Sequence, residues 1–357
     1  MKILLRTPLD STSGFGRDGI GLLSALLLQD RLHLIDVEPT VVKTPLPKQI
    51  ADLFAYDKAD YYDMEIHHIN PGGAFIDPTT TDRSGCKVLW TMWEWDTIPE
   101  TVPNFEDMRT FIPLYDHIIV YTEQSAEALR NAGMLRPDQK VSVLMGGIEA
   151  HLWCTPDHPR LSPSPFTFAM VGHLNTRKNV MGVLRAFLEL QDEKGEAFDA
   201  RLILKSQYPP FPQGLEFPNV RVISRADWTT AKLQEFYYSI NCLVNASYGE
   251  GKDLPAMEAT LSGTPTILND TPGHAGWNHP GVQELIPTQV GPHPSDTSYI
   301  GRTTEVADIK AAMWDQYTHS SKYAKITGQM AMWIEKHYTW EARVKKLFKL
   351  LDIPHES

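Results

Sequence analysis

The sequence contains little cysteine, and the few cysteines it has are scattered. Only three occur among 357 residues, at Cys86, Cys154 and Cys242. An odd number of distant cysteines excludes a disulfide framework, and none of them belongs to a C-x-x-C metal motif. We therefore expect reduced cysteines that serve as packing residues.

Long apolar runs and a positive net charge are also lacking. No stretch reaches the roughly 18 apolar residues that a membrane helix needs. In the first ten residues, MKILLRTPLD, arginine, proline and aspartate interrupt the apolar run before it is long enough for the core of a signal peptide. The formal net charge of −11 gives no general attraction to nucleic acid or anionic lipid. We expect no integral membrane segment and a cytoplasmic location.

What the sequence does contain is the composition of a globular protein with alternating strands and helices. Hydrophobic residues make up 42% and charged residues 22%, and the length is enough for two domains of ordinary size. Strands that alternate with helices predict parallel sheets with helices on both faces. The expected strands are 2–6, 32–37, 86–93, 116–122, 166–172, 200–206, 220–225, 242–247 and 264–269. The expected helices are 19–30, 122–133, 179–195, 231–240, 254–263 and 340–351.

The domain division follows from a proline-rich connector. Prolines crowd the stretch between Trp153 and Phe166, which is typical of an extended link between domains. We predict one Rossmann-like domain over residues 1–155, a second over 156–335, and a last helix within 336–357 that packs back on the first domain. Ligands of such sheets bind where strands end, so we expect the site in the cleft between the two domains.

A glycine-rich stretch near the N-terminus allows three interpretations. Gly14, Gly16 and Gly19 have the G-x-G-x-x-G spacing of a dinucleotide-binding turn, with Asp36 as the acid that would bind the ribose. The motif begins seven residues after the first predicted strand, which disfavours an NAD-dependent oxidoreductase. The glycines could instead form a loop without a ligand, or a flexible lid that closes over a sugar or phosphate.

The most informative stretch is SYGEGKDLPAMEATLSGTPTI, residues 247–267. Glu250 follows a predicted strand, Asp253 can cap the next helix, and Gly263 can end that helix. Glu258 then lies about one turn into the helix. Two carboxylates can accept hydrogen bonds from sugar hydroxyls, while the free N–H groups at the helix start receive phosphate oxygens. This combination predicts a site for a nucleotide sugar.

The same stretch resembles the E-x7-E signature of the retaining glycosyltransferases with the GT-B fold, especially their large fourth sequence family. The resemblance implies that Glu250 contacts the donor's sugar ring and that Glu258 binds the nucleotide ribose. It further implies donor contacts from Gly251, Lys252, Asp253 and Leu254. Lys252 and Asp253 stand where that family has an aromatic residue and a glycine, which leaves the donor sugar open.

A second segment, FAMVGHLNTRKNVMGVLRAF, is similar to the part of these enzymes that holds the donor diphosphate. The resemblance places Lys178 at the family's lysine position. His173 replaces the family's arginine, so Arg177 is the candidate for the second cation. Two cations beside a leaving diphosphate would stabilise the negative charge that develops there. The resemblance implies no metal ion and no other cofactor.

The first domain offers weaker candidates. His67 and His68 follow an expected strand, at the place where the family has a histidine near the transferred sugar, and we prefer His68. Either could instead be an ordinary buried or loop histidine. Trp93 and Glu94 lie in a segment that is similar to phage-encoded members of the family, and they could bind an acceptor or form part of a buried tryptophan cluster. A basic stripe on the last helix, at Arg343, Lys345, Lys346 and Lys349, is the one feature that favours a DNA acceptor. Its simpler interpretation is a solvated helix face.

The sequence thus predicts a retaining, metal-independent glycosyltransferase. It would move a sugar from a UDP- or GDP-sugar to a hydroxyl of a glycan, lipid, small molecule or hydroxymethylated DNA base, in a host cytoplasm if the chain is phage-encoded. The predicted catalytic residues are Glu250, Lys178, Arg177 and His68, with Gly14, Gly16 and His173 as further donor contacts. The alternatives are an NAD-dependent oxidoreductase and a non-catalytic nucleotide-sugar-binding protein.

Overall fold

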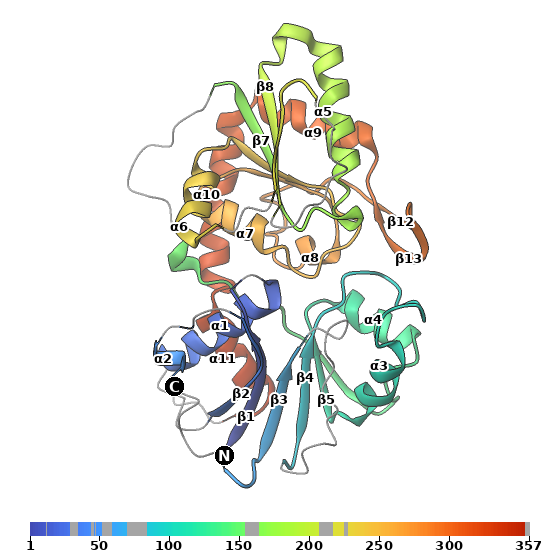
Figure 1. Cartoon of the computed structure of the whole chain (residues 1–357), viewed down its shortest axis with the longest axis vertical. Helices are drawn as coiled ribbons and strands as arrows, with labels where there is room; N and C mark the ends of the chain where they lie inside the picture. The colour runs from blue at the N-terminus through green and yellow to red at the C-terminus, as the bar shows by residue number, and fades with distance from the viewer. Residues whose placement is uncertain are drawn as a thin grey trace. The chain divides into compact units, whose positions relative to one another are not determined.

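The chain forms two compact units. The structure is a computed structural model, and it describes all residues except 12, 29–34, 44–45, 47, 52–58, 70–83, 154–163, 207–216, 225–227 and 354–357. The first unit comprises Met1–Glu149 and His337–Ser357, and the second comprises Ala150–Lys336 (Figure 1). The predicted proline-rich connector lies mostly outside the described residues.

The first unit is built on a parallel sheet in the order β2-β1-β3-β4-β5-β6. Its central strands are buried almost throughout, as expected for a sheet covered on both faces. The chain order reverses between β1 and β3, which makes this pair the topological switch point of the sheet. The strands are β1 (Ile3–Leu9), β2 (Ile35–Val42), β3 (Met64–His68), β4 (Lys87–Thr91), β5 (His117–Val120) and β6 (Lys140–Val143).

The helices of the first unit include one from the end of the chain. The helix α11 packs against α1, and Gly21 of α1 leaves room for the indole of Trp340. Side-chain caps begin two helices: Thr122 accepts from the N–H of Ser125, and Thr339 accepts from the N–H of Ala342. The helices are α1 (Gly14–Leu28), α2 (Lys48–Ala51), α3 (Phe105–Phe111), the short 3-10 turn Ile112–Leu114, α4 (Glu123–Asn131) and α11 (Trp340–Leu350).

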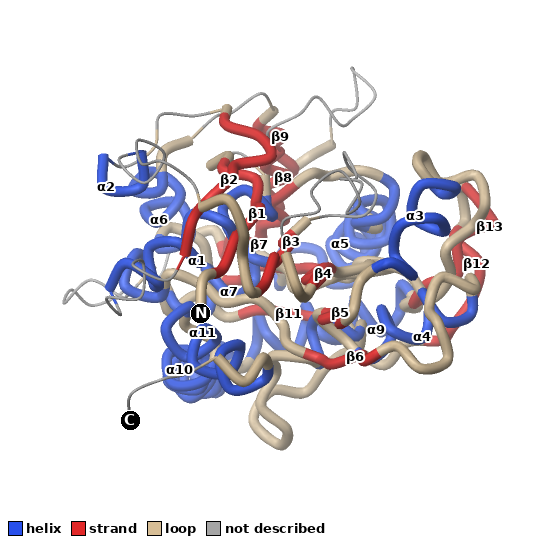
Figure 2. The backbone as a smooth tube through the Cα atoms, turned by 90° about the horizontal axis from the view of Figure 1, so that it is seen from below, coloured by secondary structure: helices blue, strands red, loops and turns tan. Residues whose placement is uncertain are grey.

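The second unit has a parallel sheet in the order β11-β10-β7-β8-β9. Its switch point lies between β7 and β10. An antiparallel hairpin of β12 and β13 follows the last parallel strand, and Figure 2 shows its two strands side by side. The strands are β7 (Phe166–Gly172), β8 (Ala200–Ser206), β9 (Val220–Ile223), β10 (Cys242–Asn245), β11 (Thr266–Leu268), β12 (Gln289–His293) and β13 (Asp296–Thr303).

Helices cover this second sheet and close its core. Apolar side chains of α5 and α9 pack with those of β7, β8 and β10 in one continuous cluster. The helices are α5 (Val180–Lys194), α6 (Thr230–Tyr238), α7 (Leu254–Leu261), α8 (Pro272–Ala275), α9 (Val306–Thr318) and α10 (Ser320–His337), with 3-10 turns at Ala150–Leu152, Thr176–Lys178 and Gly195–Ala197. No helix in the described part of the chain combines the length and apolarity that a bilayer crossing requires.

The predicted pair of α/β domains with parallel sheets is confirmed. Two local predictions are wrong. The helix expected from residue 19 begins at Gly14, so the glycine-rich stretch is the first turns of α1 and not a flexible lid. His67 and His68 belong to β3 itself and do not follow a strand. The exact domain boundaries stay predictions, because the connector is not described.

Candidate functional site

The second unit gathers charged side chains at its switch point. The loop after β7 leads into the 3-10 turn Thr176–Lys178, and the loop after β10 leads into α7. Since the two strands are parallel neighbours, both loops leave the same edge of the sheet. The backbone N–H of Tyr248 donates to the carbonyl of Arg177 (2.8 Å), which ties the two loops together.

Two cations from the first loop bind one carboxylate from the second. The Nζ of Lys178 lies 2.5 Å from Oε1 of Glu250, and Nη1 of Arg177 lies 3.2 Å from its Oε2. Lys178 and Glu250 are buried, at 5% and 3% exposed. Oε1 also accepts hydrogen bonds from Ser247 (2.6 Å) and Asn245 (3.2 Å). Glu250 therefore fixes the position of both cations that the sequence singled out.

Asp253 joins this cluster instead of capping α7. It occupies the N-cap position but makes no side-chain cap hydrogen bond, so that prediction is wrong. Its Oδ1 lies 3.4 Å from Nζ of Lys178, and its Oδ2 accepts from Asn245 (2.6 Å). The ion pair and the amide donor replace the helix N–H groups as partners of this carboxylate. Gly263 does follow the end of α7 with φ of 73°, as predicted.

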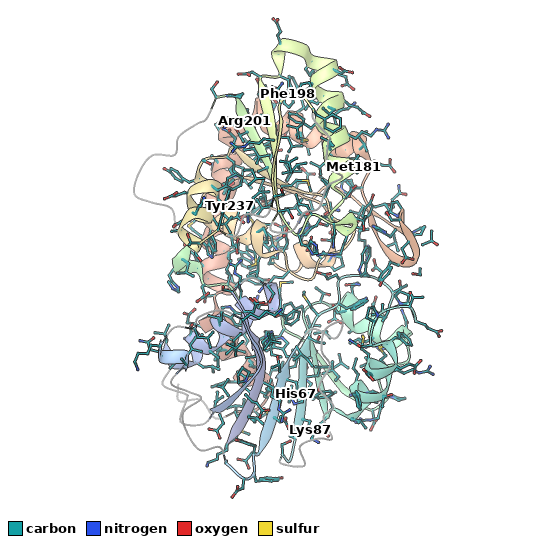
Figure 3. All side chains as sticks on the ribbon, viewed as in Figure 1. His67, Lys87, Met181, Phe198, Arg201 and Tyr237 are labelled. Atoms are coloured by element: carbon teal, nitrogen blue, oxygen red, sulfur yellow. The ribbon has the colours of Figure 1, made fainter. Side chains whose placement is uncertain are left out.

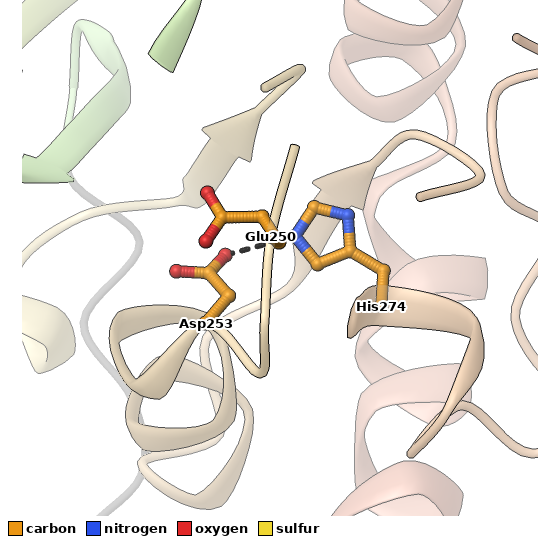
Figure 4. Close-up of side chains that lie close together, drawn as sticks. All are labelled: Glu250, Asp253 and His274. Carbon is orange, nitrogen blue, oxygen red and sulfur yellow. Dashed lines mark hydrogen bonds and ion pairs between the residues drawn. The ribbon is translucent and has the colours of Figure 1, made fainter. Parts of the chain in front are cut away.

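His274 and Gly273 are members of the site that sequence reasoning missed. The Nε2 of His274 lies 3.0 Å from Oδ2 of Asp253, and Figure 4 shows the imidazole pointing from α8 to that carboxylate. Gly273 packs so closely that a Cβ there would overlap the backbone of Glu250. The available signal was the T-P-G-H segment directly after a predicted strand, where α/β ligands bind. We name Arg177, Lys178, Glu250, Asp253 and His274 the charged cluster.

The cluster keeps its ions charged despite burial. Burial by itself raises the pKa of Glu250, but Lys178, Arg177 and His274 outweigh it and hold that pKa well below its usual range. Burial likewise lowers the pKa of Lys178, and the two carboxylates more than reverse this. The exposed His173 has a lowered pKa because of partial desolvation and the neighbouring Arg177 and Lys178. Glu250 is therefore an anion and Lys178 a cation at neutral pH.

Three members of the cluster also have the composition of a metal site. Ligand atoms of Glu250, Asp253 and His274 lie within 4.8 Å of one another. The ammonium of Lys178 is in contact with both carboxylates of this set. A divalent ion there would have to displace or repel that cation. In the observed arrangement, Glu250, Asp253 and His274 therefore suit the ammonium of Lys178 better than a metal ion.

The other predicted donor contacts surround the start of α7. Gly251 and Lys252 are buried and Leu254 is half-buried, and the carbonyl of Lys252 accepts from the indole of Trp277 (2.8 Å). Glu258 is fully buried, and its Oε2 accepts from the hydroxyl of Tyr237 (2.8 Å). Of the two glutamates in the E-x7-E pattern, Glu250 therefore lies in the loop before α7 and Glu258 on the helix.

The glycines of the first unit serve close packing. Gly16 lies against the backbone of Asp10 and Gly19 against that of Pro8, so that a Cβ at either position would overlap it. Gly14 is exposed at the start of α1. Asp36, the acid of the oxidoreductase alternative, accepts from the N–H of Ala59 (3.2 Å) and the hydroxyl of Tyr62 (2.8 Å).

His68 belongs to a buried hydrogen-bonded chain at the switch point of the first sheet. Its Nδ1 pairs with the hydroxyl of Thr7 and its Nε2 with that of Tyr121, both at 3.0 Å. Tyr121 donates to Asp18 (2.7 Å). We name Thr7, His68, Tyr121 and Asp18 the His68 chain. His68 has no exposed surface, so its predicted role beside the sugar stays a prediction.

His67 points to the other face of the same sheet. It lies between Glu65 (2.7 Å) and the hydroxyl of Tyr115 (2.5 Å), and Glu65 also pairs with Arg6 (2.8 Å). Figure 3 labels His67 among the strands. Burial lowers the pKa of His67, and Glu65 only partly opposes this. A histidine enclosed in this way is a structural residue of the sheet.

The remaining first-unit candidates lie on loops and on the last helix. Trp93 is 8% exposed and donates from its indole to the carbonyl of Thr97 (2.8 Å). Glu94 is half-buried beside it. In the basic stripe, Arg343 is buried with its guanidinium over the ring of Tyr338 (3.8 Å). The sequence predicted a uniform solvated face for this stripe, and the burial of Arg343 shows that this prediction is wrong.

The fold and this site define a class of protein, the α/β proteins with the GT-B fold. The model of the family described as "Glycosyl transferases group 1" matches residues 165–290. That range contains every member of the charged cluster. The second unit therefore carries a region similar to group 1 glycosyl transferases. No curated protein matches the chain in sequence.

Solved structures resemble the chain over its full length. HepE from Anabaena in complex with UDP and glucose has 15% identity and a TM-score of 0.66, with 99% of each chain covered. Sucrose-phosphate synthase from Thermosynechococcus elongatus has 14% identity and a TM-score of 0.70, covering 99% of this chain and 98% of that one. The apo structure of OtsA has 10% identity and a TM-score of 0.65, with complete coverage. At such identities the likeness shows the fold.

Proposed function

We propose that the protein is a retaining glycosyltransferase that transfers a sugar from a UDP- or GDP-sugar to a hydroxyl acceptor. The observation that carries the proposal is the pair of cations at the second switch point, the buried Lys178 and the half-buried Arg177, held by Glu250. The match of residues 165–290 to group 1 glycosyl transferases supports it, as does the UDP-glucose complex of the structural neighbour HepE.

The charges suit the departure of a nucleoside diphosphate. Breaking the bond between sugar and phosphate leaves negative charge on the phosphate oxygens and positive charge on the sugar ring. Lys178 and Arg177 stabilise the phosphate, together with the N–H groups at the start of α7. In the described residues Oε2 of Glu250 pairs only with Arg177, which leaves that oxygen room to accept from a sugar hydroxyl.

Glu250 is unsuited to act as a nucleophile. Its pKa is lowered by Lys178 and Arg177 after burial is overcome, and its Oε1 already accepts from Lys178, Asn245 and Ser247. Both oxygens already have partners, since Oε2 pairs with Arg177 at 3.2 Å, and a carboxylate held by two cations has little electron density to offer a sugar carbon. We therefore propose retention through attack on the same face, with the leaving phosphate taking the acceptor's proton. We also propose that no metal ion is required.

Nucleotide selectivity tests the proposal against both alternatives. We expect UDP or GDP to raise the melting temperature and NADH to leave it unchanged. At a hundredfold excess of ligand over Kd, binding adds about 2.7 kcal/mol to the free energy of unfolding. Donor hydrolysis is then measured with the matching nucleotide sugar, with and without EDTA. Stabilisation by NADH alone would favour the oxidoreductase, and UDP binding without turnover of any donor would favour a binding protein.

The acceptor is a separate proposal. Trp93 and Glu94 are the candidate acceptor residues, as an aromatic face and a carboxylate that could take up a hydroxyl proton. A hydroxymethylated DNA base remains one candidate acceptor, with Lys345, Lys346 and Lys349 as the exposed cations of α11. Transfer of labelled sugar to hydroxymethylated DNA, compared with unmodified DNA, would test it. Incorporation into neither DNA would exclude this acceptor.

A further inference from the structure

Asp253 joins the donor cation Lys178 to His274, a histidine for which the sequence predicted no role. Both side chains are buried, and neither residue's carboxylate or imidazole reaches solvent. Among the described residues, the imidazole of His274 has a hydrogen-bond partner in the charged cluster only in Asp253: Nε2 faces Oδ2 of Asp253 at 3.0 Å, while Nδ1 faces the carbonyl oxygen of Asn269 at 2.8 Å. Asp253 in turn reaches Lys178.

These contacts fix the charge of the pair. A carbonyl oxygen only accepts, so Nδ1 of His274 must carry a proton. A proton must also lie between Nε2 and Oδ2, because a bare nitrogen lone pair facing a carboxylate oxygen at 3.0 Å would be repelled. Whether that proton belongs to the imidazole or to the carboxyl, the charges of Asp253 and His274 sum to zero.

The neutral pair changes the charge balance around Lys178. Arg177 and Lys178 contribute two positive charges and Glu250 one negative charge, so the charged cluster has a net charge of +1. If Lys178 turned toward a phosphate, Glu250 would keep Arg177 at 3.2 Å and Asp253 would keep His274 at 3.0 Å. Each buried carboxylate would then still have a partner, which avoids the large cost of an unpaired buried charge.

We propose that His274 is a positioning residue that keeps Lys178 exchangeable: by neutralising Asp253, it lets the lysine ammonium leave the carboxylates for the phosphates of a bound ligand. This proposal rests on the proposed function of the cluster as a diphosphate site. The long contact of 3.4 Å between Lys178 and Asp253, against 2.5 Å between Lys178 and Glu250, fits a carboxylate whose charge is already balanced.

The backbone at Asp253 makes a clean test available. Its φ of 65° and ψ of 71° lie in the left-handed region, which glycine adopts without the steric cost that other residues meet. The Asp253→Gly change therefore removes the carboxylate without straining the start of α7. The chain also offers a matched control, since His279 is five residues further on and packs against Trp333 outside the cluster.

The test is a calorimetric titration of the full-length protein with UDP and, separately, with inorganic pyrophosphate. For His274→Gln we expect at least about tenfold weaker binding of both probes, because Asp253 then holds Lys178 as an uncompensated anion. Adding Asp253→Gly to this variant should restore binding to within about threefold of wild type. The control His279→Gln should stay within about threefold of wild type.

Several outcomes would overturn the inference. One is unchanged affinity in His274→Gln, and another is a double variant that binds as weakly as His274→Gln, which a purely structural role of the histidine would produce. If His274→Gln does not fold, the double variant Asp253→Gly/His274→Gln decides, and binding more than tenfold weaker than wild type in it contradicts the inference. A wild-type protein that binds pyrophosphate but neither UDP nor GDP refutes the proposed function only, and the pyrophosphate series then decides this inference. Binding of neither probe refutes both.

Discussion

The two switch points of this molecule have the same topology and different chemistry. In the second unit, the loops after β7 and β10 and the helix α8 bring together the buried Lys178, the half-buried Arg177, two carboxylates and a histidine. In the first unit, the switch point between β1 and β3 holds the His68 chain. Both ring nitrogens of His68 and the hydroxyl of Tyr121 have hydrogen-bond partners there, and both side chains are buried. Aromatic rings of Phe15 and Trp90 pack against His68 at 5.2 and 5.0 Å.

The difference teaches that topology offers a place for a site and the side chains decide its use. Parallel strands that diverge at a switch point leave loop ends with free backbone groups in either sheet. In the second sheet, the loops at this edge add Arg177 and Lys178, which pair with Glu250. At the equivalent position of the first sheet, the described residues include the aromatic rings that pack against His68 and the hydroxyls of Thr7 and Tyr121 that pair with it.

The largest expected effect comes from removing the exchangeable cation. Lys178→Ala should lower the rate of sugar transfer by about 10²- to 10³-fold, because the leaving phosphate loses a preorganised positive charge. Donor turnover measured at saturating nucleotide sugar checks it. Lys325→Ala, at an exposed position of α10, is the matched control. Wild-type turnover in Lys178→Ala would remove the functional distinction between the two switch points.

The corresponding change in the first unit should affect stability and not ligand binding. Tyr121→Phe removes the hydroxyl that joins His68 to Asp18, and the loss of these two buried hydrogen bonds should cost about 1–3 kcal/mol of unfolding free energy. UDP affinity should not change. Denaturant unfolding and calorimetry measure the two quantities, with the 58% exposed Tyr61→Phe as the control. A large loss of UDP affinity would show that the His68 chain also contributes to ligand binding.

The glycine-rich start of α1 should behave as packing. Gly16→Ala introduces a Cβ that overlaps the backbone of Asp10, and we expect a loss of about 1–3 kcal/mol in unfolding free energy. Gly328→Ala in α10 has open space around the new Cβ and should instead gain about 0.5–1 kcal/mol, since alanine favours helix. Loss of transfer by Gly16→Ala at unchanged stability would return the stretch to the role of a lid.

The smallest effect is a difference in acid stability. Lys178 and Arg177 lower the folded-state pKa of Glu250 from 4.5, against the opposing effect of burial. The resulting stability is complete above pH 4.5 and is lost as the pH falls further, because the unfolded chain then binds a proton that the folded chain does not. Wild type should lose up to about 1.4 kcal/mol per pH unit more than Glu250→Gln below pH 4.5. Parallel acid titrations of both proteins would contradict this pairing.

Much of the fold could be predicted from the sequence because its signals are local. The apolar runs CLVN and HIIV form buried parallel strands, as predicted. The predicted helix α4 begins after the N-cap Thr122 and ends before Gly133, which has a left-handed backbone conformation. The hairpin of β12 and β13, largely exposed and polar, gave no comparable apolar signal. The start of α1 was misjudged because glycine disfavours helix in isolation, whereas here close packing on Asp10 requires it.

The sequence by itself determined which residue types stand at strand ends: two cations before α5, and Glu250 and Glu258 around α7. Their order along the chain carries this information, because loops after parallel strands share one edge of a sheet. The tertiary structure alone decided the partners. Asp253 turned from a helix cap into the partner of Lys178 and His274, a residue 21 positions away, and His68 was enclosed by Thr7 and Tyr121. Such contacts depend on how distant segments pack, and no local pattern encodes them.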